Sequence, residues 1–249
     1  MRLHNKVAIV TGGSRGIGRA VALAFAREGA HVAVVGAHDP TALDQVVDAI
    51  TTLGKQALAL TADVSQRAEV DRMVQHVLNR WRRVDVLVNN AGIIHPTRLE
   101  EIPETQWHEI LAVHLTGTFH GIQAVIPTMK AQGGGKIINV AAPSALRGSF
   151  GVADYAAAKG GIIALTRNAA SELKPYNIQV NCISPVAETR MTDALFAFRR
   201  QHLGDTAGTF GNAKLVEPEA VAPTFVFFAC ADADYISGQI LAVDGGLTA

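Results

Sequence analysis

Short apolar segments rich in β-branched residues alternate with longer amphipathic segments along the whole chain. The short segments are apolar at consecutive positions, which is typical of strands buried on both faces of a sheet. They lie at 6–10, 31–35, 56–60, 84–88, 136–140, 178–183 and 239–243. The helical patterns between them lie at 17–28, 42–53, 66–80, 104–130, 153–174 and 218–230. This order predicts an α/β fold built on a doubly wound parallel sheet with helices on both faces.

The alternation runs through all 249 residues without a linker. An α/β domain of this length routinely forms one folding unit, so we expect a single domain over 1–249. The pattern changes only at 185–217, where an irregular segment replaces a short strand-to-helix turn. Ligands of open parallel sheets bind outside the carboxyl ends of the strands, and long insertions there are often lids. We therefore expect 185–217 to be a substrate-facing flap.

Composition narrows the class of protein. Hydrophobic residues make up 49% of the chain and charged residues 18%, with a formal net charge of +0, which favours a packed globule without a basic stripe for nucleic acid. The two cysteines, Cys182 and Cys230, have neither the number of a disulfide framework nor the spacing of a zinc site. The first apolar run is too short for a signal peptide or a membrane span. We expect a soluble cytoplasmic protein with no metal, membrane or nucleic-acid partner.

A glycine-rich segment, TGGSRGIG, follows the first predicted strand and opens the first predicted helix. Gly12 would allow the turn, Gly16 would let the backbone approach a pyrophosphate, and Gly18 would allow the helix to pack closely on the strand. The unpaired N–H groups at the start of the helix would bind the anion. A purely structural turn is the alternative interpretation.

Two other strand ends carry polar residues at the same edge of the predicted sheet. The motifs are ADV after the third strand and NNAG after the fourth. Asp63 would accept a hydrogen bond from an adenine amino group, Val64 would cover the adenine face, and Asn90 and Gly92 would line a ribose. A capping or turn role for Asp63 is the alternative.

Tyr155 and Lys159 lie four residues apart in a helical segment, ADYAAAKGG, and therefore on one helix face. A phenol has an ordinary pKa of about 10, and a nearby ammonium group favours the phenolate. The pair is a candidate proton donor and acceptor. An exposed helix face with no catalytic role is the alternative.

The four motifs TGGSRGIG, ADV, NNAG and YAAAK together resemble the short-chain dehydrogenase/reductase family, and the resemblance covers essentially the whole chain. It implies a Rossmann-type sheet of about seven strands and NAD(P)-dependent hydride transfer to or from a small-molecule carbonyl or alcohol. It also implies that Tyr155 is the general acid/base, that Lys159 bonds the nicotinamide ribose and tunes Tyr155, and that the protein is a homotetramer or homodimer.

The resemblance assigns a set of cofactor-binding positions drawn from the motifs and from the sixth strand's end. They are Gly12, Ser14, Arg15, Gly16, Ile17, Gly18, Asp63, Val64, Asn90, Ala91, Gly92, Tyr155, Lys159 and Thr189. NAD-selective relatives carry an acidic residue at the end of the second strand, where this chain has Gly36. We therefore expect NADP(H) to be favoured, with Arg15 near its 2′-phosphate. NAD(H) remains the alternative because Asp39 is close.

The chain departs from the family at two catalytic positions. The family's serine, thirteen residues before the tyrosine, is Ala142 here, and its helix asparagine is His114. Losing one preorganised donor costs about 10²–10³ in rate. Ser144 is a candidate replacement, with a turn role as its alternative, and His114 could still hold a water of the proton relay. The competing function is therefore a dinucleotide-binding protein with weak or no turnover and a regulatory or scaffold role.

Overall fold

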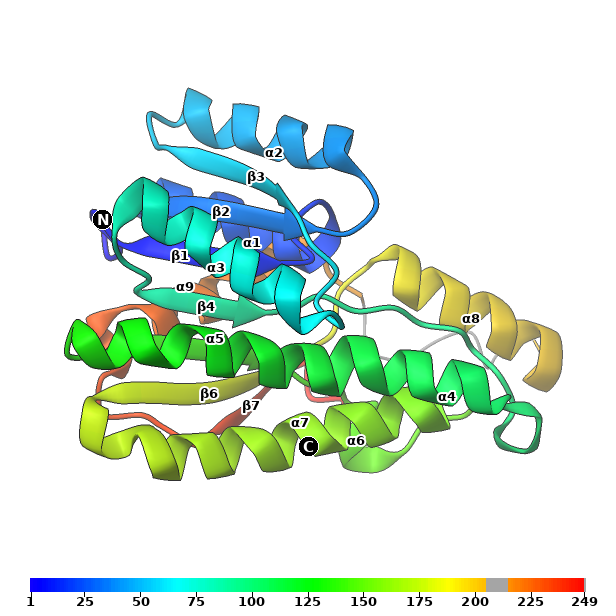
Figure 1. Cartoon of the computed structure of the whole chain (residues 1–249). Coiled ribbons are helices and arrows are strands. Elements are labelled where there is room, and N and C mark those ends of the chain that lie inside the picture. Colours follow the sequence, from blue (N-terminus) through cyan, green and yellow to red (C-terminus); the bar gives the residue numbers. More distant parts are fainter. Residues whose placement is uncertain (205–214, 249) are drawn as a thin grey trace.

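The computed structural model describes residues 1–204 and 215–248. One parallel sheet of seven strands, in the order β3-β2-β1-β4-β5-β6-β7, forms the centre of the molecule (Figure 1). The strands are β1 (Val7–Thr11), β2 (His31–Gly36), β3 (Ala57–Thr61), β4 (Val86–Asn89), β5 (Gly135–Val140), β6 (Ile178–Pro185) and β7 (Ile240–Val243). Each predicted strand is present, with ends that differ by one or two residues. The order reverses between β1 and β4, which creates the crevice where ligands of such sheets bind.

The helices cover both faces of the sheet, as the alternation predicted. They are α1 (Gly16–Arg27), α2 (Pro40–Thr52), α3 (Arg67–Trp81), α4 (Glu104–Leu111), α5 (Gly117–Ala131), α6 (Ser144–Arg147), α7 (Ala153–Leu173), α8 (Arg190–Leu203) and α9 (Pro218–Ala229). One apolar core lies between the sheet and α1, α2 and α9, and a second lies between the sheet and α3, α5 and α7. Successive β1 residues alternate between them: Ala8 and Val10 belong to the first core, Val7 and Ile9 to the second.

A single long helix runs from Glu104 to Ala131 through α4, a π-helical turn at Ala112–Thr116, and α5. By length and composition it could cross a membrane, but core helices of globular proteins pass the same test. Here it packs against α3 and α7 and contributes Ile122, Val125 and Met129 to the second core. The π-helical turn contains His114, and such turns are frequent at functional sites.

The segment 185–217 is more regular than its sequence predicts. We expected it to be irregular, whereas Arg190–Leu203 forms the helix α8. Thr189 starts this helix with a capping box, in which its hydroxyl accepts the Thr192 N–H and the Thr192 hydroxyl accepts the Thr189 N–H. Our sequence analysis missed this helix, although Met191, Leu195 and Phe198 have helical spacing. Residues 205–214 of the predicted flap lie outside the described residues.

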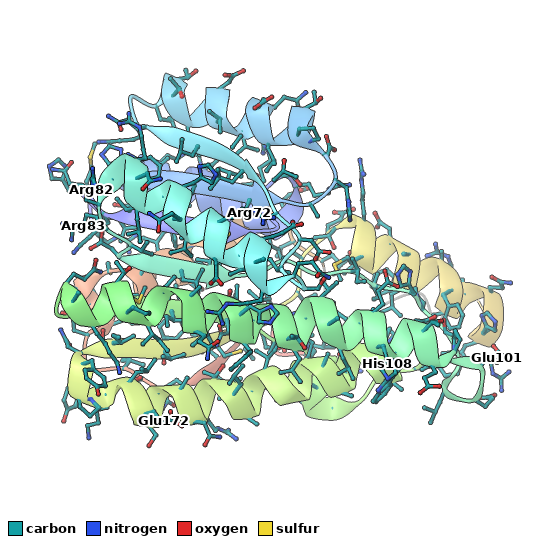
Figure 2. All side chains as sticks on the ribbon, viewed as in Figure 1. Arg72, Arg82, Arg83, Glu101, His108 and Glu172 are labelled. Carbon is teal, nitrogen blue, oxygen red and sulfur yellow. The ribbon has the colours of Figure 1, made fainter. Side chains whose placement is uncertain are left out.

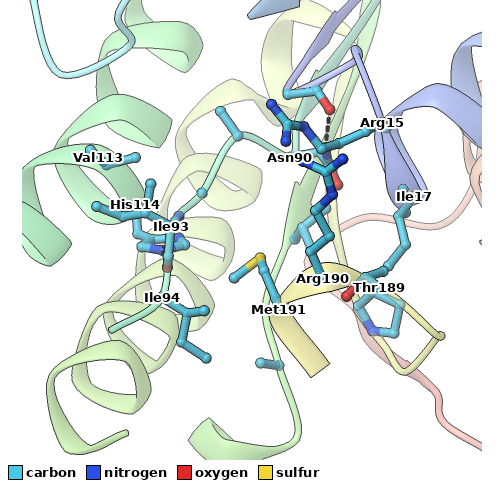
Figure 3. Close-up of a pocket in the computed structure, with 18 of the residues that line it drawn as sticks. Arg15, Ile17, Asn90, Ile93, Ile94, Val113, His114, Thr189, Arg190 and Met191 are labelled. Atoms are coloured by element: carbon cyan, nitrogen blue, oxygen red, sulfur yellow. Dashed lines mark hydrogen bonds between the residues drawn. The ribbon is translucent and has the colours of Figure 1, made fainter. Parts of the chain in front are cut away.

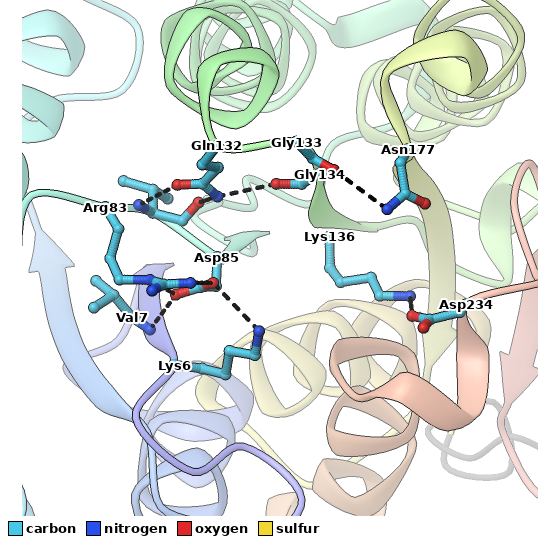
Figure 4. A network of polar contacts seen from close by, with 11 residues as sticks. Lys6, Val7, Arg83, Asp85, Gln132, Gly133, Gly134, Lys136, Asn177 and Asp234 are labelled. Carbon is cyan, nitrogen blue, oxygen red and sulfur yellow. Dashed lines mark hydrogen bonds and ion pairs between the residues drawn. The ribbon is translucent and has the colours of Figure 1, made fainter.

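Ion pairs lie at the end of the sheet where the strands begin (Figure 4). The buried Asp85 carboxylate accepts the Val7 N–H at 2.9 Å and pairs with Arg83 and Lys6. Lys136 pairs with Asp234 at 2.6 Å. Charged side chains elsewhere, such as Arg72 and Glu172, extend outward from the helices (Figure 2). The other edge of the sheet carries the candidate site.

Candidate active site

A cavity of about 930 Å³ lies at the carboxyl edge of the sheet, and Figure 3 shows part of its lining. Its walls come from segments far apart in the sequence, including the glycine loop, the ends of β3, β4, β5 and β6, and the start of α7 and α8. All predicted site residues line this one cavity. They are Gly12, Ser14, Arg15, Gly16, Ile17, Gly18, Asp63, Val64, Asn90, Ala91, Gly92, His114, Ser144, Tyr155, Lys159 and Thr189.

The glycine loop has the geometry of an anion-binding turn. Gly12 and Gly16 have φ values of +64° and +52°, a region that favours glycine. A Cβ on Gly18 would lie 2.1 Å from the Gly12 carbonyl oxygen, so only glycine allows α1 to pack this closely. No side chain among the described residues caps α1 at its start. The free N–H groups of the first turn therefore remain available to a phosphate, and the loop fits a dinucleotide.

Thr11 fixes the glycine loop to the end of β4, a role that our sequence analysis missed. Its buried hydroxyl accepts the N–H groups of Asn90 and Ala91 at 3.0 and 3.1 Å and donates to the Val88 carbonyl. The Asn90 amide donates to the carbonyls of Thr11 and Gly12. Asn90 therefore braces the turn as well as lining the cavity. The only signal in the sequence was a polar residue at the end of an apolar strand.

The cavity end next to β2 and β3 contains both charges considered for cofactor choice. Arg15 and Asp39 form an ion pair at 3.7 Å, and each side chain is about half exposed. Asp39 also caps α2 by accepting the Ala42 N–H at 3.0 Å. Asp63 accepts the Ser65 N–H at 2.9 Å, a turn contact that holds its carboxylate at the cavity wall. Both the turn role and the adenine-binding role remain compatible with this position.

Tyr155 and Lys159 lie on the same side of α7, and the Lys159 Nζ is 5.5 Å from the centroid of the Tyr155 ring. The lysine Nζ donates to the Val140 carbonyl at 2.6 Å. Burial lowers the pKa of Lys159 to about 8 and raises the pKa of Tyr155 above its ordinary value. We expected Lys159 to lower the pKa of Tyr155, but desolvation of the phenol is the larger effect. The phenol is therefore a protonated donor at neutral pH.

The start of α7 is held by a carboxylate beside the tyrosine. Asp154 is buried and accepts the Tyr155 N–H at 2.7 Å. Its other oxygen accepts the Gln106 amide at 2.8 Å. Gln106 in turn donates to the His95 carbonyl. This chain of contacts ties the loop after β4 to the helix that carries Tyr155, and sequence reasoning did not identify it.

His114 lies against Tyr155, with ring centroids 5.0 Å apart and an interplanar angle of 88°. Its Nε2 is 2.7 Å from the Ile93 carbonyl and 3.1 Å from the Ile93 N–H. Burial, with a smaller contribution from the Lys159 charge, lowers the pKa of His114 to about 3, so the ring is neutral at physiological pH. Nδ1 is buried and has no hydrogen-bond partner among the described residues.

Ala142 and Ser144 follow β5 at the cavity wall. Ala142 is buried, and Pro143 directly precedes the short helix α6, which begins at Ser144. The Ser144 Oγ is buried without a hydrogen-bond partner among the described residues. Such groups are rare in folded proteins and call for a partner supplied by water or a ligand. This observation favours a role beyond turn formation.

The reacting end of the cavity is mostly apolar. Ile93, Ile94, Val152, Met191 and Leu195 line it, and Figure 3 shows the side chains of Ile94 and Met191 inside the open space. This surface would contact the body of a substrate whose reacting oxygen meets Tyr155. Within residues 1–204 and 215–248, no group of three His, Cys, Asp or Glu side chains could hold a metal ion.

Comparisons with known proteins agree with this architecture. A family model described as short chain dehydrogenase matches residues 6–200. The 3-oxoacyl-[acyl-carrier-protein] reductase FabG of Thermotoga maritima is 37% identical over 250 residues, covering 99% of both chains. The 3-oxoacyl-[acyl-carrier-protein] reductase of a Synechocystis species is 40% identical over 247 residues, covering 98% of both.

Solved structures give the same result. Levodione reductase superimposes with a TM-score of 0.91 at 30% identity, covering 99% of both chains. NAD⁺-bound xylitol dehydrogenase superimposes with a TM-score of 0.89 at 29% identity, covering 99% of this chain and all of that one. The similarity therefore extends over the full length in both sequence and fold.

Proposed function

The chain belongs to the short-chain dehydrogenase family of NAD(P)-dependent oxidoreductases, and we propose that it is an active carbonyl reductase whose reacting centre is Tyr155 and Lys159. The observation that carries this proposal is convergence: sixteen residues chosen from separate sequence motifs line one cavity, with the Tyr155–Lys159 pair beside its apolar end. A dinucleotide-binding protein without turnover would need the cofactor-lining residues, but it would not need Tyr155 beside the apolar end of the cavity.

A nicotinamide cofactor held by the glycine loop, Asn90 and Lys159 would supply the hydride for the carbonyl carbon, or would accept it in the reverse direction. Tyr155, a phenol that is protonated at neutral pH, donates its proton to the carbonyl oxygen. Lys159 bonds the cofactor ribose and supports Tyr155 electrostatically. Ser144 supplies the donor that Ala142 lacks, and neutral His114 takes the place of the family's asparagine in the proton relay beside Tyr155.

For the substrate we propose a carbonyl compound with an apolar body, and 3-oxoacyl thioesters are the first class to test. The apolar wall formed by Ile94, Met191 and Leu195 supports an uncharged substrate near the reacting carbon. The names of the 37–40% identical relatives support the thioester. The alternative is a cyclic or open-chain ketone, which the similarity to levodione reductase supports.

The direct experiment follows NADPH and NADH oxidation by the purified protein against 3-oxoacyl thioesters, ketones, aldehydes and quinones. We expect turnover with at least one apolar carbonyl compound and its loss in Tyr155→Phe. Tight dinucleotide binding without turnover on any class would contradict the proposal and favour a regulatory or scaffold protein.

We also propose that NADP(H) is the preferred cofactor. The end of β2 carries Gly36 rather than a carboxylate. The Arg15 side chain reaches Asp39, three residues after this strand end, and could therefore bind a 2′-phosphate located there. NAD(H) is the alternative, because Asp39 partly neutralises Arg15.

Finally, we propose a cytoplasmic, single-domain protein over 1–249 that assembles as a homotetramer or homodimer, with 185–217 as its substrate-facing flap. The helix Glu104–Ala131 supports assembly, because only 39% of its apolar 18-residue stretch is buried in one copy. Trp107 and Phe119 on this helix are exposed and could be covered by a second copy. Both cysteines are free, which fits a reducing compartment. Sedimentation velocity of the purified protein tests the assembly.

A further inference from the structure

The start of α8 lies directly across from the glycine loop. A Cβ built on Gly16 would be 3.5 Å from the Cγ2 of Thr189, the residue that caps α8. The first turns of α1 and α8 therefore approach each other over the middle of the cavity. No side chain among the described residues caps α1, so the free N–H groups at its start make this region favourable for negative charge.

Arg190, the first residue of α8, adds a full positive charge at this place. Its side chain is exposed and lines the cavity, and Figure 3 shows it extending toward the same region as Arg15. Arg15 has a counter-charge in Asp39 at 3.7 Å, and Arg19 has one in Glu219 at 3.8 Å. Arg190 forms no ion pair within residues 1–204 and 215–248. It is thus a cation at the cavity without a protein partner there.

The acidic residues nearby do not supply that partner. Glu188 and Glu217 also line the cavity, but neither pairs with Arg190 in the described part of the chain. An anion bound between the Arg15 and Arg190 guanidinium groups would be attracted to both. The arrangement therefore indicates a ligand with negative charge at the meeting point of the two helix starts.

We propose that Arg190 binds the pyrophosphate of the dinucleotide from the flap side, opposite the glycine loop. This inference rests on the proposed cofactor site and adds a residue that none of the sequence motifs identified. The guanidinium fork suits phosphate oxygens because it donates two parallel hydrogen bonds. Because Arg190 belongs to the flap segment, its contact would also fix the start of α8 when cofactor binds.

The test measures dissociation constants of NADPH, NADH, ADP-ribose and AMP by fluorescence or calorimetric titration, without any substrate. We expect Arg190→Ala to weaken the binding of NADPH, NADH and ADP-ribose alike, by up to about fivefold, because a charged contact at an exposed site contributes little more than this. AMP has no pyrophosphate, so its binding should not change. Arg190→Lys should recover part of the loss. Raising the salt concentration should weaken dinucleotide binding by the unmodified protein more than binding by the Arg190→Ala variant.

Arg200→Ala is the matched control, because Arg200 is an exposed arginine on the same helix that does not line the cavity, and its substitution should leave all four constants unchanged. Loss confined to NADPH would overturn the inference in favour of 2′-phosphate binding. A raised KM for substrate with unchanged dinucleotide constants would overturn it in favour of a substrate anion. If the unmodified protein bound none of the three dinucleotide ligands, the cofactor site itself would be wrong, and this inference with it.

Discussion

The ring of His114 meets the ring of Tyr155 edge to face, at a centroid distance of 5.0 Å and an angle of 88°. A buried, neutral imidazole therefore lies beside the proposed acid, at the position of the family's asparagine. Its Nε2 is held by the Ile93 backbone, and its Nδ1 has no hydrogen-bond partner in the described structure. The predictions below separate its structural and catalytic contributions from those of Tyr155 and Ser144.

Tyr155→Phe should abolish carbonyl reduction and leave dinucleotide affinity nearly unchanged, because it removes the proton donor and keeps the ring. Lys159→Ala should reduce both, since Lys159 is assigned to the cofactor ribose as well. Steady-state kinetics with a validated substrate and a cofactor titration measure the two effects. Retention of most activity by Tyr155→Phe would rule out the acid/base role.

Ser144→Ala should lower kcat by about 10²-fold with little change in cofactor affinity, because it removes the proposed donor to the carbonyl oxygen. Ala142→Ser should raise activity or rescue that loss. Ser149→Ala is the control: its hydroxyl lines the same cavity but is already bonded by Arg199. An unchanged kcat in Ser144→Ala, measured where chemistry limits the rate, would show that Ser144 only shapes the turn.

The depressed pKa of His114 should make stability depend on pH. The unfolded chain protonates this ring below about pH 6.5, whereas the folded protein keeps it neutral down to about pH 3. Folding stability is therefore fully present above the unfolded value and is lost as pH falls through this window, by up to about 1.4 kcal/mol per pH unit. His114→Asn should lose less folding stability than the unmodified protein as the pH falls from about 6 to about 4. Urea unfolding of both proteins measures the difference, and equal slopes would contradict the assignment.

Gly92→Ala should destabilise the protein, because the new Cβ would lie 2.3 Å from the Cε1 of His114. Overpacking of this kind costs about 1–3 kcal/mol. Adding His114→Ala should cancel part of that cost, so the two changes should be non-additive in thermal or urea unfolding. Gly160→Ala is the control, since nothing lies within 4 Å of its added Cβ. Strict additivity of the pair would mean that Gly92 is not constrained by His114.

Cofactor choice should respond to the ion pair between Arg15 and Asp39. Asp39→Asn removes the carboxylate and keeps the cap on α2, so NADPH should bind about threefold tighter or more. Arg15→Ala should weaken NADPH more than NADH. Asp48→Asn is the control, because Asp48 is an exposed carboxylate on the same helix, and it should change the affinity for neither NADPH nor NADH. Tighter binding of NADH than of NADPH by the unmodified protein would reverse the proposed preference.

The sequence predicted all seven strands, every long helix except α8, and many of the residues that line the cavity. Burial on both faces makes strands apolar at every position, and this local signal located all seven strands to within two residues. Tyr155 and Lys159 share a helix face because a four-residue spacing is about one turn. Gly12 and Gly18 could be assigned because a positive φ and a close backbone approach each require glycine.

The contacts between these elements follow from the fold and could not be predicted from local sequence. Thr11 braces Asn90, and Thr189 brings Arg190 to the glycine loop, through contacts between residues about 80 and 170 positions apart. The sequence analysis missed the helix α8, and the Thr189 capping box that starts it is visible only in the structure. The direction of the Tyr155 pKa shift also depends on the fold. The spacing on one helix predicts that the Lys159 charge lowers the pKa of Tyr155. The desolvation that raises this pKa comes from every segment packed around the phenol.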